Sequence, residues 1–336
     1  MSDKRVLYIG TPIFNYHKHI ITEFEKQGYT VDYYDDRPSE NSFIKGIIKI
    51  RRSSMKSLIQ KYFDRILAET KGTYYDLVFI VNCKVFTPNM IRQLRDNQRS
   101  AKFVLYMWDS LELYPNSKDL IAIFDKAYSF DTNDCDKIES LNLLPLFYHK
   151  GYEKLGQEVV PESEYDILSV CTVHPNRYKI MRVLFPELES KGICIFSYMF
   201  LDKLQYLYNK VFAKEFKGAK TSEFKFKHLS EHEYLALLKK SNTVFDIPHN
   251  KQSGLTMRTI ETLGAKRKII TTNTNIKKYD FYNENNISVM NEHNLAGIEQ
   301  FLKHEYEPIS EDIYKKYSLR NWIKVIVTQS ENKYLG

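Results

Sequence analysis

The chain has 336 residues, of which 43% are hydrophobic and 27% are charged. This balance indicates a globular protein rather than a disordered chain, and no apolar stretch approaches the roughly 18 residues of a membrane-spanning helix. The 49 lysines and arginines exceed the 42 aspartates and glutamates, which gives a net charge of +7. An excess of this size suits anionic small molecules, anionic lipid and nucleic acid about equally, so charge alone selects no partner.

The amino-terminal residues and the cysteines bear on the cellular compartment. The start, MSDKRVLYIGTPIF, holds only a short apolar run before Gly10, so we expect neither a signal peptide nor a transmembrane helix. The cysteines are scattered without metal-type pairing, at Cys83, Cys135, Cys171 and Cys194. We interpret them as reduced structural thiols and expect a cytoplasmic protein.

Short β-branched runs alternate with amphipathic segments along the first half of the chain. This alternation is typical of parallel α/β architecture. Strands are predicted at 5–10, 29–35, 75–82, 102–109, 126–132 and 143–149. Helices are predicted at 17–28, 43–72, 87–98, 117–125 and 135–142.

A polar segment, EKLGQEVVPESE, follows Tyr152, and the pattern then restarts. Strands are predicted at 165–173, 193–200, 224–230, 242–248 and 268–273, with helices at 177–192, 202–218 and 231–241. The pattern predicts two doubly wound Rossmann-like domains facing a cleft. We expect them at 1–152 and 165–310, followed by closing helices at 311–336.

The most informative stretch is QSGLTMRTIETLGAKRKIITTN, at 252–273, directly after the strand at 242–248. In open α/β sheets, ligands bind where loops run from the carboxyl ends of strands into helix N-termini. We expect a helix that begins near Ser253 as its N-cap, with Gly254 allowing a close backbone approach. Free amides and the helix dipole would make that end a phosphate site.

Arg258 and Glu261 lie three residues apart on this predicted helix and therefore share a face. The cation could reach a diphosphate, and the carboxylate could accept hydrogen bonds from a ribose diol. The commoner alternative for such a pair is a solvated surface ion pair. Gly264 fits the end of the helix, after which the chain returns to the sheet.

With SEHEYLALLKKSNTVFDIP before it and DFYNENNISVM after it, this stretch resembles the signature of bacterial GT-B-fold glycosyltransferases. These enzymes build lipopolysaccharide and capsular polysaccharide, and they include CgeB-like proteins. The resemblance is specific over about 230–290 and looser elsewhere. It implies that 165–310 holds a nucleotide sugar and that Glu261 contacts its ribose. Retaining members often carry an acid where this chain has Ser253, so the stereochemical outcome stays open.

The resemblance implies a hexosyltransferase-type enzyme that transfers a sugar from a nucleotide diphosphate to a glycan or lipid-linked acceptor. The domain at 1–152 would then be the acceptor-side domain. No metal cluster is visible in the sequence, so we expect a metal-independent reaction without a further cofactor.

Two other loops at this predicted sheet edge supply candidate donor-binding residues. Arg177, in CTVHPNRYKIM, could face the diphosphate from the opposite wall; the alternative is a surface arginine at a helix start. His174, in the same loop, is a weaker candidate. DIPHN adds Asp246 and His249 at the end of a strand, where loop residues commonly meet ligands.

The acceptor-side domain supplies the candidate bases. Asp109, in YMWDSLELYP, ends an apolar strand and could act as a general base; the alternative is a helix cap or structural contact. His17 is the rival base because its ordinary pKa suits the role. Trp108 is either a core residue or a platform for a sugar ring.

Two basic amphipathic segments, Lys45–Lys61 and 206–220, mix lysine and arginine with apolar residues. Helices of this type can lie on anionic membranes at the inner face of the cell membrane. The commoner alternative is an amphipathic helix that packs on its own domain.

Other functions are weighed against the transferase. A nicotinamide dehydrogenase is set aside because the first loop, GTPIFNY, lacks the three-glycine pattern. A sugar-nucleotide epimerase of the same fold and a non-catalytic nucleotide- or sugar-binding protein stay as alternatives. No nucleic-acid-binding module is recognised, so no nucleic-acid partner is expected.

Overall fold

The computed structural model describes residues 4–12, 14–38, 55–158, 163–249, 252–290 and 297–336. The chain divides into two compact units. The first comprises Met1–Leu146, Asn250–Gly254 and Leu319–Tyr334, and the second comprises Phe147–His249, Leu255–Ser318 and Leu335–Gly336. The last helix therefore belongs with the amino-terminal unit, although it lies far from that unit in sequence. Among the described residues, no helix is both long and apolar enough to cross a membrane.

The first unit is built on a parallel sheet whose described strands run in the order β2-β1-β3-β4-β5-β6. The strands are β1 (Lys4–Ile9), β2 (Tyr29–Tyr34), β3 (Leu77–Val81), β4 (Lys102–Met107), β5 (Lys126–Ser129) and β6 (Leu141–Leu143). The central strands β3 and β4 are almost continuous apolar runs because helices cover both faces of the sheet. The strand order reverses between β1 and β3, which makes this the topological switch point.

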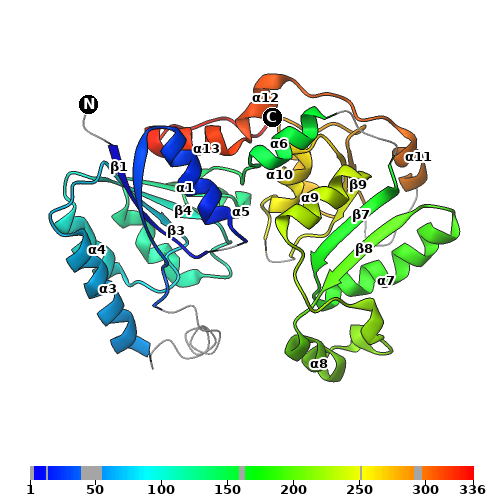
Figure 1. Cartoon of the computed structure of the whole chain (residues 1–336), viewed down its shortest axis with the longest axis horizontal. Helices are drawn as coiled ribbons and strands as arrows, with labels where there is room; N and C mark the ends of the chain where they lie inside the picture. Colours follow the sequence, from blue (N-terminus) through cyan, green and yellow to red (C-terminus); the bar gives the residue numbers. More distant parts are fainter. Residues whose placement is uncertain (1–3, 13, 39–54, 159–162, 250–251, 291–296) are drawn as a thin grey trace. The chain divides into compact units, whose positions relative to one another are not determined.

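Alternate residues of these strands face opposite helical layers. On one face, Ile80 packs into a core with Phe63 of α3. On the other face, Trp322 of α13 meets the rings of Phe79 and Tyr106, with ring centres 5.7 and 4.8 Å apart. Helices α1 and α13 lie side by side (Figure 1). The helical segments of this unit are α1 (Tyr16–Lys26), α3 (Lys56–Thr70), α4 (Pro88–Asn97), the 3-10 helix η2 (Pro115–Ile123), α5 (Thr132–Lys137) and α13 (Leu319–Thr328).

The second unit has its own parallel sheet, with the described strands in the order β11-β10-β9-β7-β8. They are β7 (Tyr165–Thr172), β8 (Ile195–Phe200), β9 (Ser241–Asp246), β10 (Lys268–Thr271) and β11 (Ile287–Val289). The α-helices are α6 (Lys150–Gln157), α7 (Pro175–Ser190), α8 (Lys203–Phe212), α9 (Glu231–Lys239), α10 (Met257–Gly264), α11 (Ile298–Lys303) and α12 (Glu311–Lys316). Short 3-10 helices complete it: η3 (Lys214–Phe216), η4 (Thr221–Glu223) and η5 (Thr274–Lys278). The two doubly wound Rossmann-like domains predicted from the sequence are confirmed.

Two strand predictions are wrong. The strand expected at 143–149 lies earlier, as β6, and the chain leaves the sheet before Pro145, which has no N–H for a ladder. The strand expected at 224–230 is only an isolated bridge between Phe200 and Lys225. The first residues of the polar segment after Tyr152 form the end of α6.

The long helix expected at 43–72 is described only from residue 55, because 39–54 lie outside the described residues. In the described part, α3 buries Ile59, Phe63 and Ile66 in the core of its own unit. The described portion of the basic segment Lys45–Lys61 therefore includes a helix that packs on its own domain.

Candidate functional site

The second sheet has its topological switch point between β7 and β9. From β7 the chain runs to β8 on one side, whereas β9 is followed by β10 and β11 on the other. Helix α7 starts just after β7, and α10 starts after β9. Because β7 and β9 are parallel neighbours, both loops leave the same edge of the sheet. This is the place in an open α/β sheet where helix N-termini and their free amides receive anionic ligands.

Arg177, in the first turns of α7, joins the two strands at this point. Its Nε donates to the carbonyl of Ile247, 3.0 Å away, and its Nη1 donates to the carbonyl of Thr172, 2.5 Å away. Its Nη2 also contacts the Ile247 carbonyl. A planar guanidinium can make this fork, whereas an ammonium cannot. The residue proposed as a phosphate ligand therefore also fixes the ends of β7 and β9.

Two histidines meet beside this guanidinium. The rings of His174 and His249 lie 5.5 Å apart in an edge-on arrangement. His174 is the N-cap of α7, and its Nδ1 accepts a hydrogen bond from the Arg177 amide at 3.3 Å. Burial, together with the charges of Arg177 and His249, lowers the pKa of His174 to about 4. The imidazole is therefore neutral at pH 7, as an accepting cap requires. His174, the weaker of the candidate donor-binding residues, therefore has a structural role as the N-cap of α7.

Helix α10 begins later than predicted. Its N-cap is Thr256, whose hydroxyl accepts from the Thr259 amide at 3.1 Å, so the prediction of Ser253 as N-cap is wrong. Thr256 also donates to the Asp246 carboxylate at 2.6 Å. Asp246 is buried at the end of β9 and therefore holds the start of α10. The sequence offered Asp246 as a loop residue near ligand, but its contact with Thr256 was not foreseen.

Arg258 and Glu261 share a face of α10, as predicted. Arg258 Nη1 lies 3.2 Å from Glu261 Oε2, and the Glu261 side chain is only 2% exposed. The guanidinium lies over the ring of Tyr234 from α9, 3.8 Å from its centre. The alternative of a solvated surface pair is wrong, because the carboxylate is buried. Tyr234 was not singled out in the sequence, although it lies within the stretch that carries the resemblance.

Ser253 and Gly254 belong to the first unit. The Ser253 amide donates to Asp131 at 2.7 Å, and its hydroxyl donates to the same carboxylate at 2.5 Å. The Ser253 hydroxyl also accepts from the Asn133 amide, at 2.9 Å, at the start of α5. A Cβ on Gly254 would meet the Phe130 carbonyl oxygen at 2.4 Å. The close approach expected at Gly254 therefore exists, but its partner in the structure is Phe130.

Gly264 is the last residue of α10, as predicted. Glycine is not needed there to form a left-handed helix cap. A Cβ there would lie 2.4 Å from the ring of Tyr148. The next residue, Ala265, is right-handed at φ −80°. Glycine is therefore required because α10 packs closely on the Tyr148 side chain.

The switch point of the first unit is organised by Asp36. Its side chain is fully buried after β2. It accepts from the Thr11 hydroxyl at 2.7 Å and from the Lys84 amide at 3.0 Å, which joins the loops after β1 and β3. Burial raises the pKa of Asp36 to about 6.

Asp109 follows β4 at this edge of the first sheet. Its carboxylate accepts from Asn82 Nδ2 at 2.9 Å and lies 3.0 Å from Lys84 Nζ. Burial acts to lower the pKa of Lys84, but Asp109 and Tyr114 outweigh it and raise that pKa. Asp109 therefore makes the structural contacts that were the alternative to a role as general base. Its role as a base stays a prediction.

The backbone beneath this carboxylate is strained. Asn82 and Cys83 both adopt left-handed φ values, 62° and 50°. The Asn82 side-chain oxygen accepts from the amides of Trp108 and Asp109, at 2.7 and 3.1 Å, which stabilises the turn. Non-glycine residues in this region cost free energy and often cluster at functional sites.

The two other first-unit candidates lie in aromatic surroundings. His17 is in the first turn of α1, and its ring stacks on Tyr33 with 5.3 Å between centres. Trp108 is 9% exposed and contacts Tyr16 and Tyr106. Trp108 is therefore a core residue in this structure.

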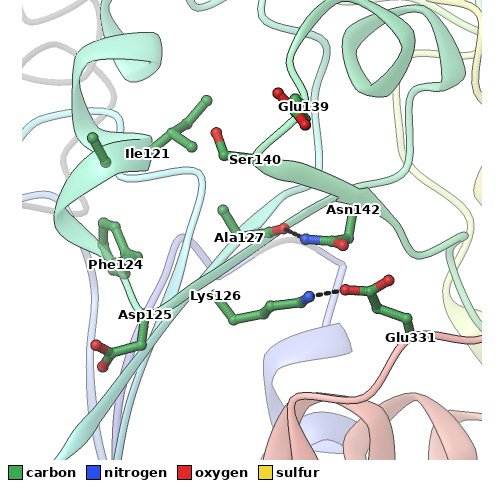
Figure 2. Close-up of a pocket in the computed structure, with 10 residues that line it drawn as sticks. Ile121, Phe124, Asp125, Lys126, Ala127, Glu139, Ser140, Asn142 and Glu331 are labelled. Carbon is green, nitrogen blue, oxygen red and sulfur yellow. Dashed lines mark hydrogen bonds and ion pairs between the residues drawn. The ribbon is translucent and has the colours of Figure 1, made fainter.

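A pocket of about 320 Å³ lies elsewhere in the first unit. Figure 2 shows Lys126 and Glu331 forming an ion pair in its wall, beside Asn142. Lys126 begins β5, so the pocket adjoins the amino ends of the strands. It is therefore separate from the edge that carries Asp36 and Asp109.

Comparison with known proteins identifies the fold. No family model matches the chain, and no curated protein matches it. A UDP-forming α,α-trehalose-phosphate synthase from Burkholderia xenovorans, solved with glucose-6-phosphate, is similar at TM-score 0.60 and 9% identity, covering 96% of this chain and 98% of that one. A glycosyltransferase from Rickettsia africae ESF-5 is similar at TM-score 0.57 and 12% identity, covering 97% and 95%.

The same fold also occurs in an enzyme of another class. A UDP-GlcNAc 2-epimerase from Neisseria meningitidis, bound to UDP-GlcNAc, is similar at TM-score 0.54 and 9% identity, covering 97% of this chain and 99% of that one. At such identities the likeness establishes architecture. The chain has the two-domain α/β fold of the GT-B glycosyltransferases and UDP-GlcNAc 2-epimerases.

Proposed function

We propose that the chain is a glycosyltransferase that moves a sugar from a nucleotide diphosphate donor to a glycan or lipid-linked acceptor in cell-surface polysaccharide synthesis. The observation that carries the proposal is the buried Glu261, paired with Arg258 on the helix that follows β9. The fold supports it, because ligands of such sheets bind at this edge.

The energetics of the Arg258–Glu261 pair favour a binding role. Removing two charges from water costs free energy that their attraction does not always repay, so a buried ion pair is weak evidence for a purely stabilising role. A buried carboxylate held by a cation is an acceptor already oriented for a neutral diol. We propose that Glu261 binds the ribose hydroxyls and that Arg258 holds its carboxylate in place.

The leaving diphosphate would be stabilised by fixed positive groups at the same edge. The amino-terminal ends of α7 and α10 supply the positive ends of helix dipoles. Arg177 and His249 lie beside the end of β9 and complete the proposed donor-binding set. Such preorganised groups lower the barrier by binding developing negative charge. On this proposal the reaction needs neither a metal ion nor a further cofactor.

The proposed base is Asp109, on the first unit. Its hydrogen bond from Asn82 and its ion pair with Lys84 hold the carboxylate in one orientation, from which it would take the proton of the acceptor hydroxyl. His17 is the rival, since a neutral imidazole can perform the same transfer.

A sugar-nucleotide epimerase is the second candidate, because a neighbour in fold is a UDP-GlcNAc 2-epimerase bound to UDP-GlcNAc. An epimerase acts on the nucleotide sugar alone, whereas a transferase needs an acceptor. The two proposals therefore differ in whether an acceptor changes the products.

The test is a screen of nucleotide sugars by thermal shift, followed by product analysis with donor labelled in the sugar. A ligand at 100 times its dissociation constant should raise the stability of the unit that binds it by about 2.7 kcal/mol. We expect label in an acceptor product, with a nucleoside diphosphate released. A labelled epimer formed without acceptor would instead support the epimerase. If no nucleotide sugar stabilises the chain, both proposed functions are contradicted.

A further inference from the structure

Helix α8 turns an apolar face toward solvent. Leu204, Leu207, Tyr208, Val211 and Phe212 are 78%, 58%, 59%, 74% and 71% exposed, respectively. Their spacing of three and four residues places them on one stripe of the helix. Scattered exposed apolar residues are ordinary, but a contiguous set on one helix marks an interaction surface.

The opposite face of α8 accounts for its attachment to the second unit. Tyr206 and Asn209 are buried on that face. The Tyr206 ring contacts Phe224 and Phe226, with ring centres 5.3 and 5.7 Å apart. The expected packing of this helix on its own domain is therefore present, but it uses only one face.

The apolar stripe is bordered by positive charge. Over residues 202–220 the chain carries five lysines and two acidic residues, which gives a net charge of +3. The lysines, all exposed, are Lys203, Lys210, Lys214, Lys217 and Lys220. Lys203 and Lys210 are seven residues apart, so they lie along the same flank of α8. Their flexible stems can follow the apolar surface while their ammonium groups stay in water.

An apolar stripe bordered by lysines favours a lipid surface over a protein partner. Protein interfaces are depleted in lysine, whereas helices that lie on membranes carry lysine and arginine beside an apolar face. We propose that α8 and the lysines that follow it dock the protein on an anionic lipid bilayer. The five apolar side chains would enter the boundary between headgroups and acyl chains, and the lysines would contact anionic headgroups.

A tryptophan reporter tests this docking directly. The native Trp108 and Trp322 are 9% and 1% exposed, so they provide a constant background. Phe212→Trp places a reporter on the stripe, and Tyr74→Trp places a matched one at a residue that is 63% exposed outside it. On vesicles of phosphatidylcholine mixed with phosphatidylglycerol, we expect a blue shift and quenching by brominated lipid for Phe212→Trp alone. Added salt should weaken both signals.

A second pair of variants measures the binding itself by vesicle flotation. Leu207→Glu with Val211→Glu should lower the bound fraction by about tenfold, because each change removes apolar area and adds repulsion from the anionic surface. The control is Leu58→Glu with Val183→Glu, two exposed apolar residues on α3 and α7, which should bind as the unchanged chain does. Circular dichroism checks that both variants fold.

Three results would overturn the proposal. One is no binding of the unchanged chain to the mixed vesicles, and another is equal binding by the α8 variant and the control. The third is a dimer of the unchanged chain in sedimentation velocity that the α8 substitutions dissociate. The stripe would then bind a second copy of the chain rather than lipid. None of these readouts depends on enzymatic activity, so they leave the proposed function untouched.

Discussion

Arg258 and Glu261 form an ion pair of 3.2 Å across one turn of α10, and the acidic partner is buried. A pair at this spacing on an exposed helix contributes only a few tenths of a kcal/mol. Here the guanidinium also stacks on Tyr234, whose pKa is raised by burial. Breaking such a pair leaves a buried charge without compensation, which costs far more than the pair contributes to stability.

The Arg177 fork should be sensitive to a change that keeps the charge. Arg177→Lys removes the planar donors that join the Ile247 and Thr172 carbonyls, so we expect the free energy of unfolding of the second unit to fall by about 1–3 kcal/mol. Chemical denaturation measures it. The control, Arg182→Lys on the same helix, changes an exposed arginine that donates to the Lys217 carbonyl, and it should cost less than about 0.5 kcal/mol. Equal losses would contradict the role assigned to Arg177.

His174 should make the second unit less stable in acid. Its folded-state pKa of about 4 lies below its ordinary 6.5, so between these values the unfolded chain binds a proton that the folded chain excludes. Stability should therefore fall as the pH drops from 6.5 toward 4 and be unaffected by this group above 6.5. His174→Asn keeps a capping acceptor but cannot titrate, and it should flatten this part of the profile. A profile for His174→Asn identical to that of the unchanged chain would refute the prediction.

Gly264 should tolerate no side chain while Tyr148 is present. Gly264→Ala places a Cβ against the tyrosine ring, and we expect a loss of about 1–3 kcal/mol in the free energy of unfolding. The same change in a Tyr148→Ala background should cost clearly less, because the clash is removed. An equal cost in both backgrounds would mean that the helix end, rather than the tyrosine, demands glycine.

Asp109→Asn tests the proposed base. The amide retains the shape of the side chain but cannot accept the proton, so we expect kcat to fall by roughly 10²–10⁴ while donor affinity stays nearly unchanged. The parallel variant His17→Gln should keep most of its activity. If Asp109→Asn turns over normally and His17→Gln does not, the base is His17.

Much of the fold follows from local patterning, because strands buried on both faces must be apolar throughout. β3 and β4 show this directly, since every residue of β3 and all but the first of β4 are buried. The segment at 224–230 also looks like a strand because phenylalanine and lysine alternate in it. Instead, Phe224 fills a small aromatic core with Tyr178 and Phe216, a tertiary arrangement that a pattern of period two does not reveal.

The candidate site was only partly predictable for a related reason. The spacing of Arg258 and Glu261 predicts a shared face, but not that the carboxylate is buried. Ser253 has the composition of an N-cap, yet its hydroxyl binds Asp131, 122 residues away in sequence, so α10 begins at the next available cap, Thr256. Local sequence preference shows which residues can cap a helix, whereas long-range hydrogen bonds determine which of them does so.

The most direct test of the account measures whether Glu261 binds a ribose diol. Calorimetric titration would compare the unchanged chain with Glu261→Gln, using the nucleoside diphosphate that gives the largest thermal shift and its 2′,3′-dideoxy counterpart. We expect the substitution to weaken the natural ligand by about 1.5–3 kcal/mol, because charge-assisted hydrogen bonds are lost. It should cost the dideoxy ligand much less, since those bonds are already absent. Equal losses for both ligands, or no loss for either, would contradict a contact between Glu261 and the ribose.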